Sequence, residues 1–270
     1  MRLLELDKIY CMDCLEGLKL LDNNCIDLTV TSPPYDDLRT YNGYSFDFEN
    51  TAKELYRITK DGGVVVWVVA DKTNNGSETG TSFKQALFFK DIGFNLHDTM
   101  IYMSDKPPLT HNRYEQKFEY MFVFSKGKPK TFNPIMEECK YAGSDKKART
   151  FRHTGDELQE THIKNKVNKE KIKGNVWYFS TGYNKSTKDK IAFKHPAIFP
   201  EQLVNDHIIS WSNKGDIVLD PFIGSGTTAK MAKLNDRNFI GFEISKEYCD
   251  IANARVQYAE MAQMRITDFI

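Results

Sequence analysis

The sequence Asp220-Pro221-Phe222-Ile223-Gly224-Ser225-Gly226-Thr227-Thr228 follows the apolar segment 216–220, and a helix-like segment continues from it through Leu234. A second apolar segment, 238–243, comes next and ends in Glu243. The order strand, glycine-rich turn, helix, strand is the unit from which open parallel α/β sheets are built. We therefore predict an α/β fold with a ligand site at this turn. Glu243, about 20 residues beyond the turn, is expected to hydrogen-bond a ribose diol.

The glycine-rich turn lacks the features of a phosphate site. A P-loop needs Gly-Lys-Ser/Thr, and Ser225-Gly226-Thr227-Thr228 contains no lysine. The dinucleotide pattern G-x-G-x-x-G is also missing, because Ala229 occupies its last position. Asp220 brings a negative charge that would repel a pyrophosphate and attract a cation. An adenosine cofactor with a cationic amino-acid tail, S-adenosylmethionine, satisfies these features. The alternative is an ordinary βαβ turn whose glycines serve tight packing.

A second candidate site is Val30-Thr31-Ser32-Pro33-Pro34-Tyr35, which ends the apolar segment 26–30. The two prolines fix their own φ angles and stiffen the loop. Ser32, the Pro33 carbonyl and Tyr35 then lie at the carboxyl end of a strand, where open α/β sheets bind their ligands. Such a loop can accept hydrogen bonds from an exocyclic amino group while the tyrosine stacks on a planar ring. The alternative is a Pro-Pro turn with a packed aromatic side chain.

Composition and charge are consistent with a soluble protein that has one basic segment. The 270 residues, 40% hydrophobic and 27% charged, suit one large α/β domain with an insertion, or two small domains. Net charge is zero, yet residues 140–194 contain 14 Lys/Arg and 6 Asp/Glu, so the rest of the chain is acidic. A basic segment on an acidic body indicates a local polyanion-binding surface. A solvated, partly disordered face is the alternative.

The remaining patterns predict the elements around the two sites. Segment 64–69 is a continuous β-branched run typical of a strand buried on both faces. Periodicity is lost between residues 131 and 190. Residues 9–28 are expected to form a strand, a helix and a second strand. Further helices are expected at 48–60, 82–91, 200–212 and 245–261, and the first of these is expected to end at Asp61-Gly62-Gly63. Further strands are expected at 95–103 and 118–125.

Cysteine usage and hydropathy exclude several classes. Cys11 and Cys14 form a lone C-x-x-C without a second ligand pair, so we expect no metal site. No apolar run reaches the ~18 residues that a membrane span needs. The N-terminus lacks the layout of a signal peptide. We expect a reduced, cytoplasmic protein.

Three segments resemble DNA amino methyltransferases of the permuted, beta-type order. Thr31–Tyr35 resembles the catalytic motif of that family, and Asp220–Thr228 resembles its cofactor motif. The segment that precedes the cofactor strand in the family is similar to His195-Pro196-Ala197-x-Phe199-Pro200-x-x-Leu203. The resemblance spans nearly the whole chain. It implies a Rossmann-like S-adenosylmethionine-dependent fold with a mixed, mostly parallel sheet. Residues 1–130 would form the catalytic half, 131–190 a target-recognition insertion and 191–270 the cofactor-binding half of the same domain.

Motif order and content separate this resemblance from two neighbouring classes. Release-factor glutamine methyltransferases place their cofactor motif before an Asn-Pro-Pro-Tyr, whereas here the catalytic motif comes first. Carbon-5 cytosine methyltransferases need a Pro-Cys nucleophile, and the chain contains no Pro-Cys.

The resemblance also assigns residues. Ser32, Pro33, Pro34 and Tyr35 would be catalytic, holding a base that has been flipped out of the duplex during direct methyl transfer. Residues implied in cofactor binding are Asp13, Cys14, Leu15, Ser32, Asp220, Phe222, Gly224, Gly226, Thr227 and Glu243. Basic residues expected to bind DNA are Lys146, Lys147, Arg149, Arg152, Lys164 and Lys166.

The acceptor base is inferred from the form of two motifs. In the family, Ser-Pro-Pro-Tyr tends to accompany methylation of N4 of cytosine, and Asp- or Asn-Pro-Pro-Tyr/Phe that of N6 of adenine. The His-Pro-Ala-x-Phe-Pro form also resembles the cytosine-type members, so cytosine is favoured and adenine is the alternative. A catalytically inactive DNA-binding relative and an RNA methyltransferase are the rival functions. The expected partner is double-stranded DNA in a prokaryotic or phage context. The sequence leaves open a cognate restriction endonuclease and a homodimer.

Overall fold

The computed structural model describes residues 4–34, 46–105, 113–144, 148–154, 157–163 and 166–267. The chain forms two compact units, the first comprising Met1–Asn133 and Asn175–Ile270 and the second Pro134–Gly174. The insertion predicted at 131–190 therefore has both of its ends in the first unit. Its C-terminal part includes β12 (Val176–Phe179), which pairs with β6 (Asn95–Ser104).

The first unit is built around an eight-stranded sheet in the order β1-β14-β13-β2-β3-β7-β6-β12. Neighbouring strands are parallel except around β7, which runs antiparallel to both β3 and β6. This mixed, mostly parallel sheet confirms the predicted fold class. Besides β6 and β12, its strands are β1 (Lys8–Cys11), β2 (Ile26–Thr31), β3 (Thr59–Val69), β7 (Phe118–Ser125), β13 (Ile217–Asp220) and β14 (Asn238–Glu243).

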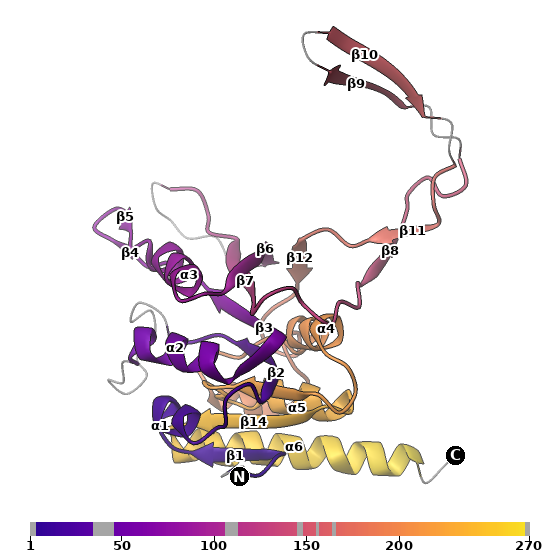
Figure 1. The fold of residues 1–270 in the computed structure, drawn as a ribbon. Helices are drawn as coiled ribbons and strands as arrows, with labels where there is room; N and C mark the ends of the chain where they lie inside the picture. The colour runs from indigo at the N-terminus through magenta and orange to yellow at the C-terminus, as the bar shows by residue number, and fades with distance from the viewer. Residues whose placement is uncertain are drawn as a thin grey trace. The chain divides into compact units, whose positions relative to one another are not determined.

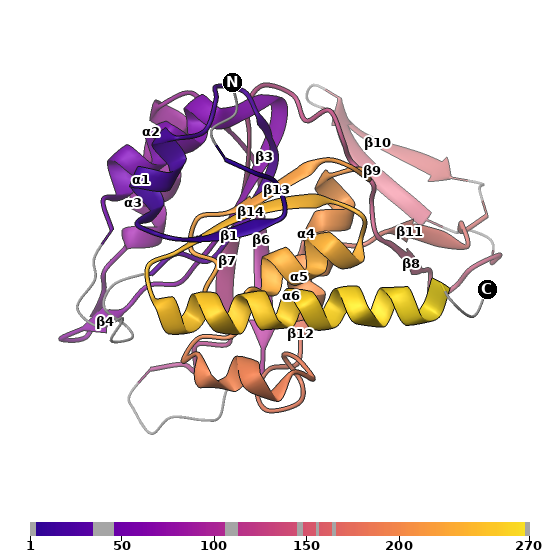
Figure 2. The ribbon, with the colours of Figure 1, turned by 90° about the horizontal axis from the view of Figure 1, so that it is seen from below.

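Helices cover both faces of the sheet (Figures 1 and 2). One layer holds α1 (Cys14–Lys19), α2 (Phe48–Ile58) and α3 (Thr81–Asp91). The other layer holds α4 (Glu201–Trp211), α5 (Thr227–Leu234) and the long α6 (Lys246–Thr267), coloured orange to yellow in Figure 2. Shorter elements of this unit are the pair β4 (Thr73–Asn74) and β5 (Ser77–Glu78) and the 3-10 helix η1 (Lys190–Lys194). No helix in the described part of the chain is both long and apolar enough to cross a lipid bilayer.

Strand β3 forms the centre of the hydrophobic core. Its residues Val64–Val69 are each at most 1% exposed, which confirms the prediction of a strand buried on both faces. The Trp67 indole is fully buried, and its Nε1 donates to Gln85 Oε1 at 2.9 Å. Beside it the rings of Phe89 and Phe124 stack with centroids 4.5 Å apart. Aromatic packing of this kind fixes the sheet against α3.

The predicted glycine end of the helix at 48–60 is wrong. Helix α2 ends at Ile58, and Thr59 already has extended backbone angles. The Thr59 hydroxyl donates to Leu55 O at 2.6 Å and so satisfies one of the last helical carbonyls. The chain therefore enters β3 directly, and Gly62, with φ of +80°, lies within that strand.

The second unit consists of two antiparallel strand pairs. β8 (Met136–Glu138) pairs with β11 (Glu170–Ile172), and β9 (Ala148–Thr154) pairs with β10 (Glu157–Ile163). The sequence predicted no regular structure here. These strands are polar and rich in charged residues, so the alternation of hydrophobic and polar residues that marks a half-buried strand is absent from them.

Candidate active site

The strand order brings residues from both ends of the chain to one edge of the sheet. β1, β14, β13 and β2 are adjacent and parallel, so their carboxyl ends meet along the same edge. Asp13, Glu243, Asp220 and Ser32 lie at or just beyond those four ends, in that order. Carboxyl edges of parallel sheets are the usual ligand sites of α/β proteins.

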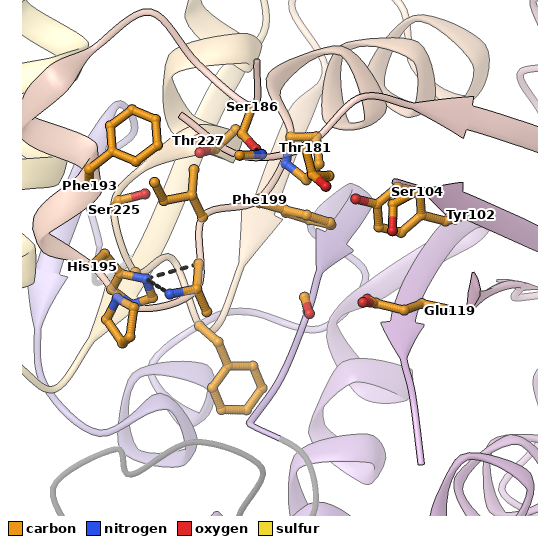
Figure 3. A pocket seen from close by; sticks show the side chains of 18 of the residues that line it. Tyr102, Ser104, Glu119, Thr181, Ser186, Phe193, His195, Phe199, Ser225 and Thr227 are labelled. Atoms are coloured by element: carbon orange, nitrogen blue, oxygen red, sulfur yellow. Dashed lines mark hydrogen bonds between the residues drawn. The ribbon is translucent and has the colours of Figure 1, made fainter. Parts of the chain in front are cut away.

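A cavity of about 790 Å³ opens at this edge (Figure 3). Among the residues predicted from the sequence, it is lined by Ser32, Asp220, Phe222, Gly224 and Thr227. The catalytic motif and the glycine-rich turn therefore face one shared space, as their proposed cooperation requires.

Asp220 joins the two motifs directly. Its buried carboxylate accepts hydrogen bonds from the hydroxyls of Thr31 (2.6 Å) and Thr228 (2.7 Å) and from the backbone N–H of Phe222 (3.0 Å). These three donors belong to the end of β2, the start of α5 and the turn between β13 and α5. Burial raises the pKa of Asp220 to about 6, although the hydrogen bonds favour the ionised form. The side chain thus fixes one motif against the other.

Stability should depend on pH through Asp220. The Asp pKa is about 3.9 in an unfolded chain, so the raised folded value means that the native state binds the proton more tightly. The stability that protonated Asp220 contributes is complete below pH ~4 and is lost as pH rises through about 6, by on the order of 2–3 kcal/mol. Between pH 4 and 7 the free energy of unfolding of the wild type, measured with urea, should therefore fall by this amount relative to that of Asp220→Asn.

The comparison between these two proteins isolates the carboxylate. Burial lowers the pKa of His207 to about 3, which makes acid destabilising, but it does so in both proteins. Burial also raises the pKa of Glu243 in both. Identical pH profiles of the two proteins would contradict the assignment of this titration to Asp220.

Glu243 connects the glycine-rich turn to the end of β14 by hydrogen bonds. Its carboxylate accepts from Gly224 N at 3.0 Å and from Ser245 N at 2.9 Å. It does not line the described cavity, but its strand lies between β1 and β13. The side chain is held by backbone donors, so its orientation at the sheet edge is fixed.

The N-terminal residues of the predicted cofactor site have local structural partners. The Asp13 carboxylate caps α1, accepting from Leu15 N (2.8 Å) and Glu16 N (3.2 Å). Cys14 is buried, and burial raises the pKa of its thiol to about 12. Neither these residues nor Gly226 line the described cavity. Met12 N donates to Glu243 O at 2.9 Å, so this segment adjoins the end of β14.

The other predicted residues divide by location. Pro33 and Pro34 continue from Ser32 but do not line the cavity, and Tyr35 lies outside the described residues. Among the basic residues, Lys146, Lys147 and Lys164 also lie outside the described residues. Arg149 and Arg152 belong to β9 of the second unit, opposite His162 and Gln159 of β10, and Lys166 is an exposed residue of that unit.

Two walls of the cavity come from segments whose residues the sequence analysis did not assign to the site. One is 193–200, which includes His195; the other is 181–186. His195 Nδ1 accepts from Ala197 N at 3.1 Å, its ring lies 4.4 Å from that of Tyr248, and a side chain at Gly224 would come within 3.0 Å of its Nε2. The His-Pro-Ala motif was the available signal for the first wall.

A further wall faces the glycine-rich turn. Tyr102 and Ser104 of β6 and Glu119 of β7 point into the cavity across from Ser225 and Thr227 (Figure 3). Burial and the charge of Glu119 raise the pKa of Tyr102, which keeps its phenol protonated. No sequence signal identifies these residues, because in the chain they are ordinary members of two core strands.

Comparison with known proteins identifies the arrangement. Residues 26–254 match the family model N6_N4_Mtase, described as DNA methylase. The chain is 63% identical over 235 residues to the orphan methyltransferase M.BamHII of Bacillus amyloliquefaciens, covering 86% of this chain and 89% of that protein.

Solved structures share the fold. The cytosine-N4-specific PvuII DNA methyltransferase has a TM-score of 0.66 at 21% identity, covering 92% of this chain and 85% of that one. The M1.HpyAVI complex with SAM has a TM-score of 0.59 at 24% identity, covering 92% and 98%. The family match, the close relative and the shared fold show that the chain belongs to the N6/N4 DNA methylase family of S-adenosylmethionine-dependent methyltransferases.

Proposed function

We propose that this protein transfers a methyl group from S-adenosylmethionine to N4 of a cytosine flipped out of duplex DNA. The observation that carries the proposal is the shared cavity: Ser32 and the glycine-rich turn line one space, and Asp220 bonds both motifs. A donor bound at the turn and an amino group at the Ser-Pro-Pro loop would then be neighbours. Proximity and orientation of this kind contribute up to ~7–11 kcal/mol to a two-reactant step.

The cofactor half of the proposal rests on the chemistry of the sheet edge. Asp220 and Glu243 bring negative charge to a site whose cofactor is cationic, and Glu243 lies where a ribose diol would be bound. The glycine-rich turn lets the methionine end approach the backbone. When bound, S-adenosylmethionine supplies an electrophilic methyl group on its sulfonium.

The catalytic half assigns direct roles to the loop after β2. The Ser32 hydroxyl and the Pro33 carbonyl accept the two amino hydrogens and thereby direct the nitrogen lone pair toward the methyl group. Tyr35 stacks on the base. Ser32 is too weak a base to remove the proton first, so the proton leaves after transfer.

The wall of Tyr102, Ser104 and Glu119 is proposed to receive the ring of the acceptor base. On the edge that carries its amino group, cytosine also has the ring nitrogen N3 and, beyond it, the carbonyl oxygen O2, and both are hydrogen-bond acceptors. The protonated Tyr102 phenol and the Ser104 hydroxyl are donors that match them. Serine at position 32, where adenine enzymes tend to carry Asp or Asn, supports cytosine over adenine. Duplex DNA is the proposed partner, held by the basic segment 140–194.

Nucleoside mass spectrometry tests the proposal. Duplex DNA of mixed sequence is incubated with the full chain and methyl-labelled S-adenosylmethionine, then digested to nucleosides. The expected product is labelled N4-methyl-2′-deoxycytidine. Labelled N6-methyl-2′-deoxyadenosine would instead show that adenine, the alternative, is the acceptor base. Label found only in a competing RNA would overturn the DNA assignment, and cofactor binding without any transfer would identify an inactive relative.

A further inference from the structure

Arg255 is a fully buried arginine of α6 that lies behind the cavity and does not line it. Its side chain is 0% exposed, and its charge is balanced by Asp189 (Nε to Oδ2, 2.9 Å) and Glu201 (Nη2 to Oε1, 2.6 Å). Lys230 of α5 pairs with the same two carboxylates, each at 2.7 Å. Two cations and two anions therefore form one compact cluster.

The guanidinium also bonds the glycine-rich turn. Arg255 Nη1 donates to Ser225 O at 2.7 Å, to Ser225 Oγ at 3.1 Å and to Thr227 Oγ1 at 3.0 Å. Both acceptor residues line the cavity. The turn is thus held from behind by a charged donor as well as by its own backbone bonds.

The two carboxylates that bind Arg255 belong to residues that follow two further walls of the cavity. Asp189, with Thr187, follows the wall 181–186, and Arg255 Nη2 lies 3.4 Å from Thr187 Oγ1. Glu201 follows directly on the wall 193–200, and its N–H donates to Ser186 O at 3.0 Å. One guanidinium therefore connects three chain segments that border the same cavity.

Only arginine has the geometry for these contacts. Its planar fork presents five N–H donors in fixed directions, whereas a lysine ammonium is a single point charge. A site whose walls are fixed before binding does not have to be ordered by its ligand, and so binds more tightly.

We infer that Arg255 is a positioning residue for the cofactor: it holds three walls of the cavity at the spacing that S-adenosylmethionine needs. The inference rests on the proposed assignment of residues 224–227 to the cofactor. Arg255 acts through the turn and the two neighbouring walls and does not touch the cofactor.

Lys230 provides a matched control. Lys230→Met and Arg255→Met each remove one cation from the same carboxylate pair. The hydrogen bonds described for the Lys230 ammonium go to those two carboxylates, whereas the Arg255 guanidinium also makes three to Ser225 and Thr227. The conservative Arg255→Lys keeps the charge and loses the fork. Comparing these variants separates support of the turn from stability of the ion cluster.

Calorimetric titration of the full-length variants with S-adenosylmethionine, with urea unfolding alongside, tests the inference. We expect Arg255→Lys to raise the cofactor Kd at least tenfold and Lys230→Met less than threefold, despite a comparable loss of stability. With saturating cofactor, kcat of Arg255→Lys should stay within about threefold of wild type. Thr187→Val removes a hydroxyl that donates to Glu201 at 2.6 Å and accepts from Arg255 at 3.4 Å, and it leaves the bonds of Arg255 to the turn in place. It should raise the Kd about threefold, and it tests the inference if Arg255→Lys fails to fold.

An equal rise of the Kd in Arg255→Lys and Lys230→Met would overturn the inference, because the effect would then belong to the cluster as a whole. An unchanged Kd in both Arg255→Lys and Thr187→Val would do the same. Gly224→Ala distinguishes the inference from the function on which it rests, since it alters the turn directly, at φ +50° and 3.0 Å from His195. A raised Kd in Gly224→Ala together with an unchanged Kd in Arg255→Lys refutes only the role of Arg255. A normal Kd in both refutes the cofactor assignment as well.

Discussion

Gly226→Ala is expected to lower the free energy of unfolding by about 2–5 kcal/mol and to abolish cofactor binding. Gly226 precedes α5 with φ of +81°, a conformation that costs an L-residue roughly 1–2 kcal/mol. A Cβ at this position would lie 2.7 Å from Ala252 Cα, in the backbone of α6. The two helices would have to separate, and overpacking of this kind costs about 1–3 kcal/mol. Urea unfolding and calorimetric titration measure both effects.

Gly80→Ala is the control for backbone strain. Gly80 also precedes a helix, α3, with a left-handed φ of +65°, but a Cβ there meets no atom within 4 Å. We expect it to cost only the strain of roughly 1–2 kcal/mol and to leave the cofactor Kd unchanged. Equal losses in the two variants would show that the contact with α6 adds nothing.

Glu243→Ala is expected to raise the Kd for S-adenosylmethionine at least 100-fold. The carboxylate is proposed to accept both hydroxyls of the ribose, and hydrogen bonds to a charged group are worth about 1.5–3 kcal/mol each. Its loss also frees the N–H groups of Gly224 and Ser245, so the glycine-rich turn loses its tie to β14. Glu243→Gln keeps one acceptor oxygen and should show an intermediate Kd. Calorimetric titration gives all three values.

Asp7→Ala is the matched control, because Asp7, which precedes β1, bonds the opposite end of β14. The Asp7 carboxylate accepts from Phe239 N at 3.0 Å and pairs with Lys233 at 3.0 Å. Its removal should lower stability by about 1–2 kcal/mol with less than a twofold change in the cofactor Kd. A comparable loss of affinity in both variants would mean that any damage to β14 weakens binding, and would remove the case for a ribose contact.

Local sequence signals located the elements that carry the two motifs. The apolar runs of β3, β13 and β14 are continuous, and the turn before α5 has glycines where the backbone takes positive φ at Gly224 and Gly226. The helix end at Ile58 was missed because a side-chain hydroxyl, from Thr59, does the capping that the Gly-Gly pair was expected to do. Side chains can replace backbone signals without leaving a pattern in the sequence.

By itself the sequence determined the family, the fold class and the two motifs, because these depend on short stretches whose backbone chemistry is local. The tertiary structure alone decided which groups complete the cavity: the strand order brings Asp220 to Thr31 across 189 residues, and packing directs Tyr102, Glu119 and the segment 181–186 into the same space. It also decided that the side chain of Arg255 is fully buried, which no pattern in the sequence of α6 indicates. Such contacts join residues distant in the chain, so only the pairing of strands and the packing of helices specify them.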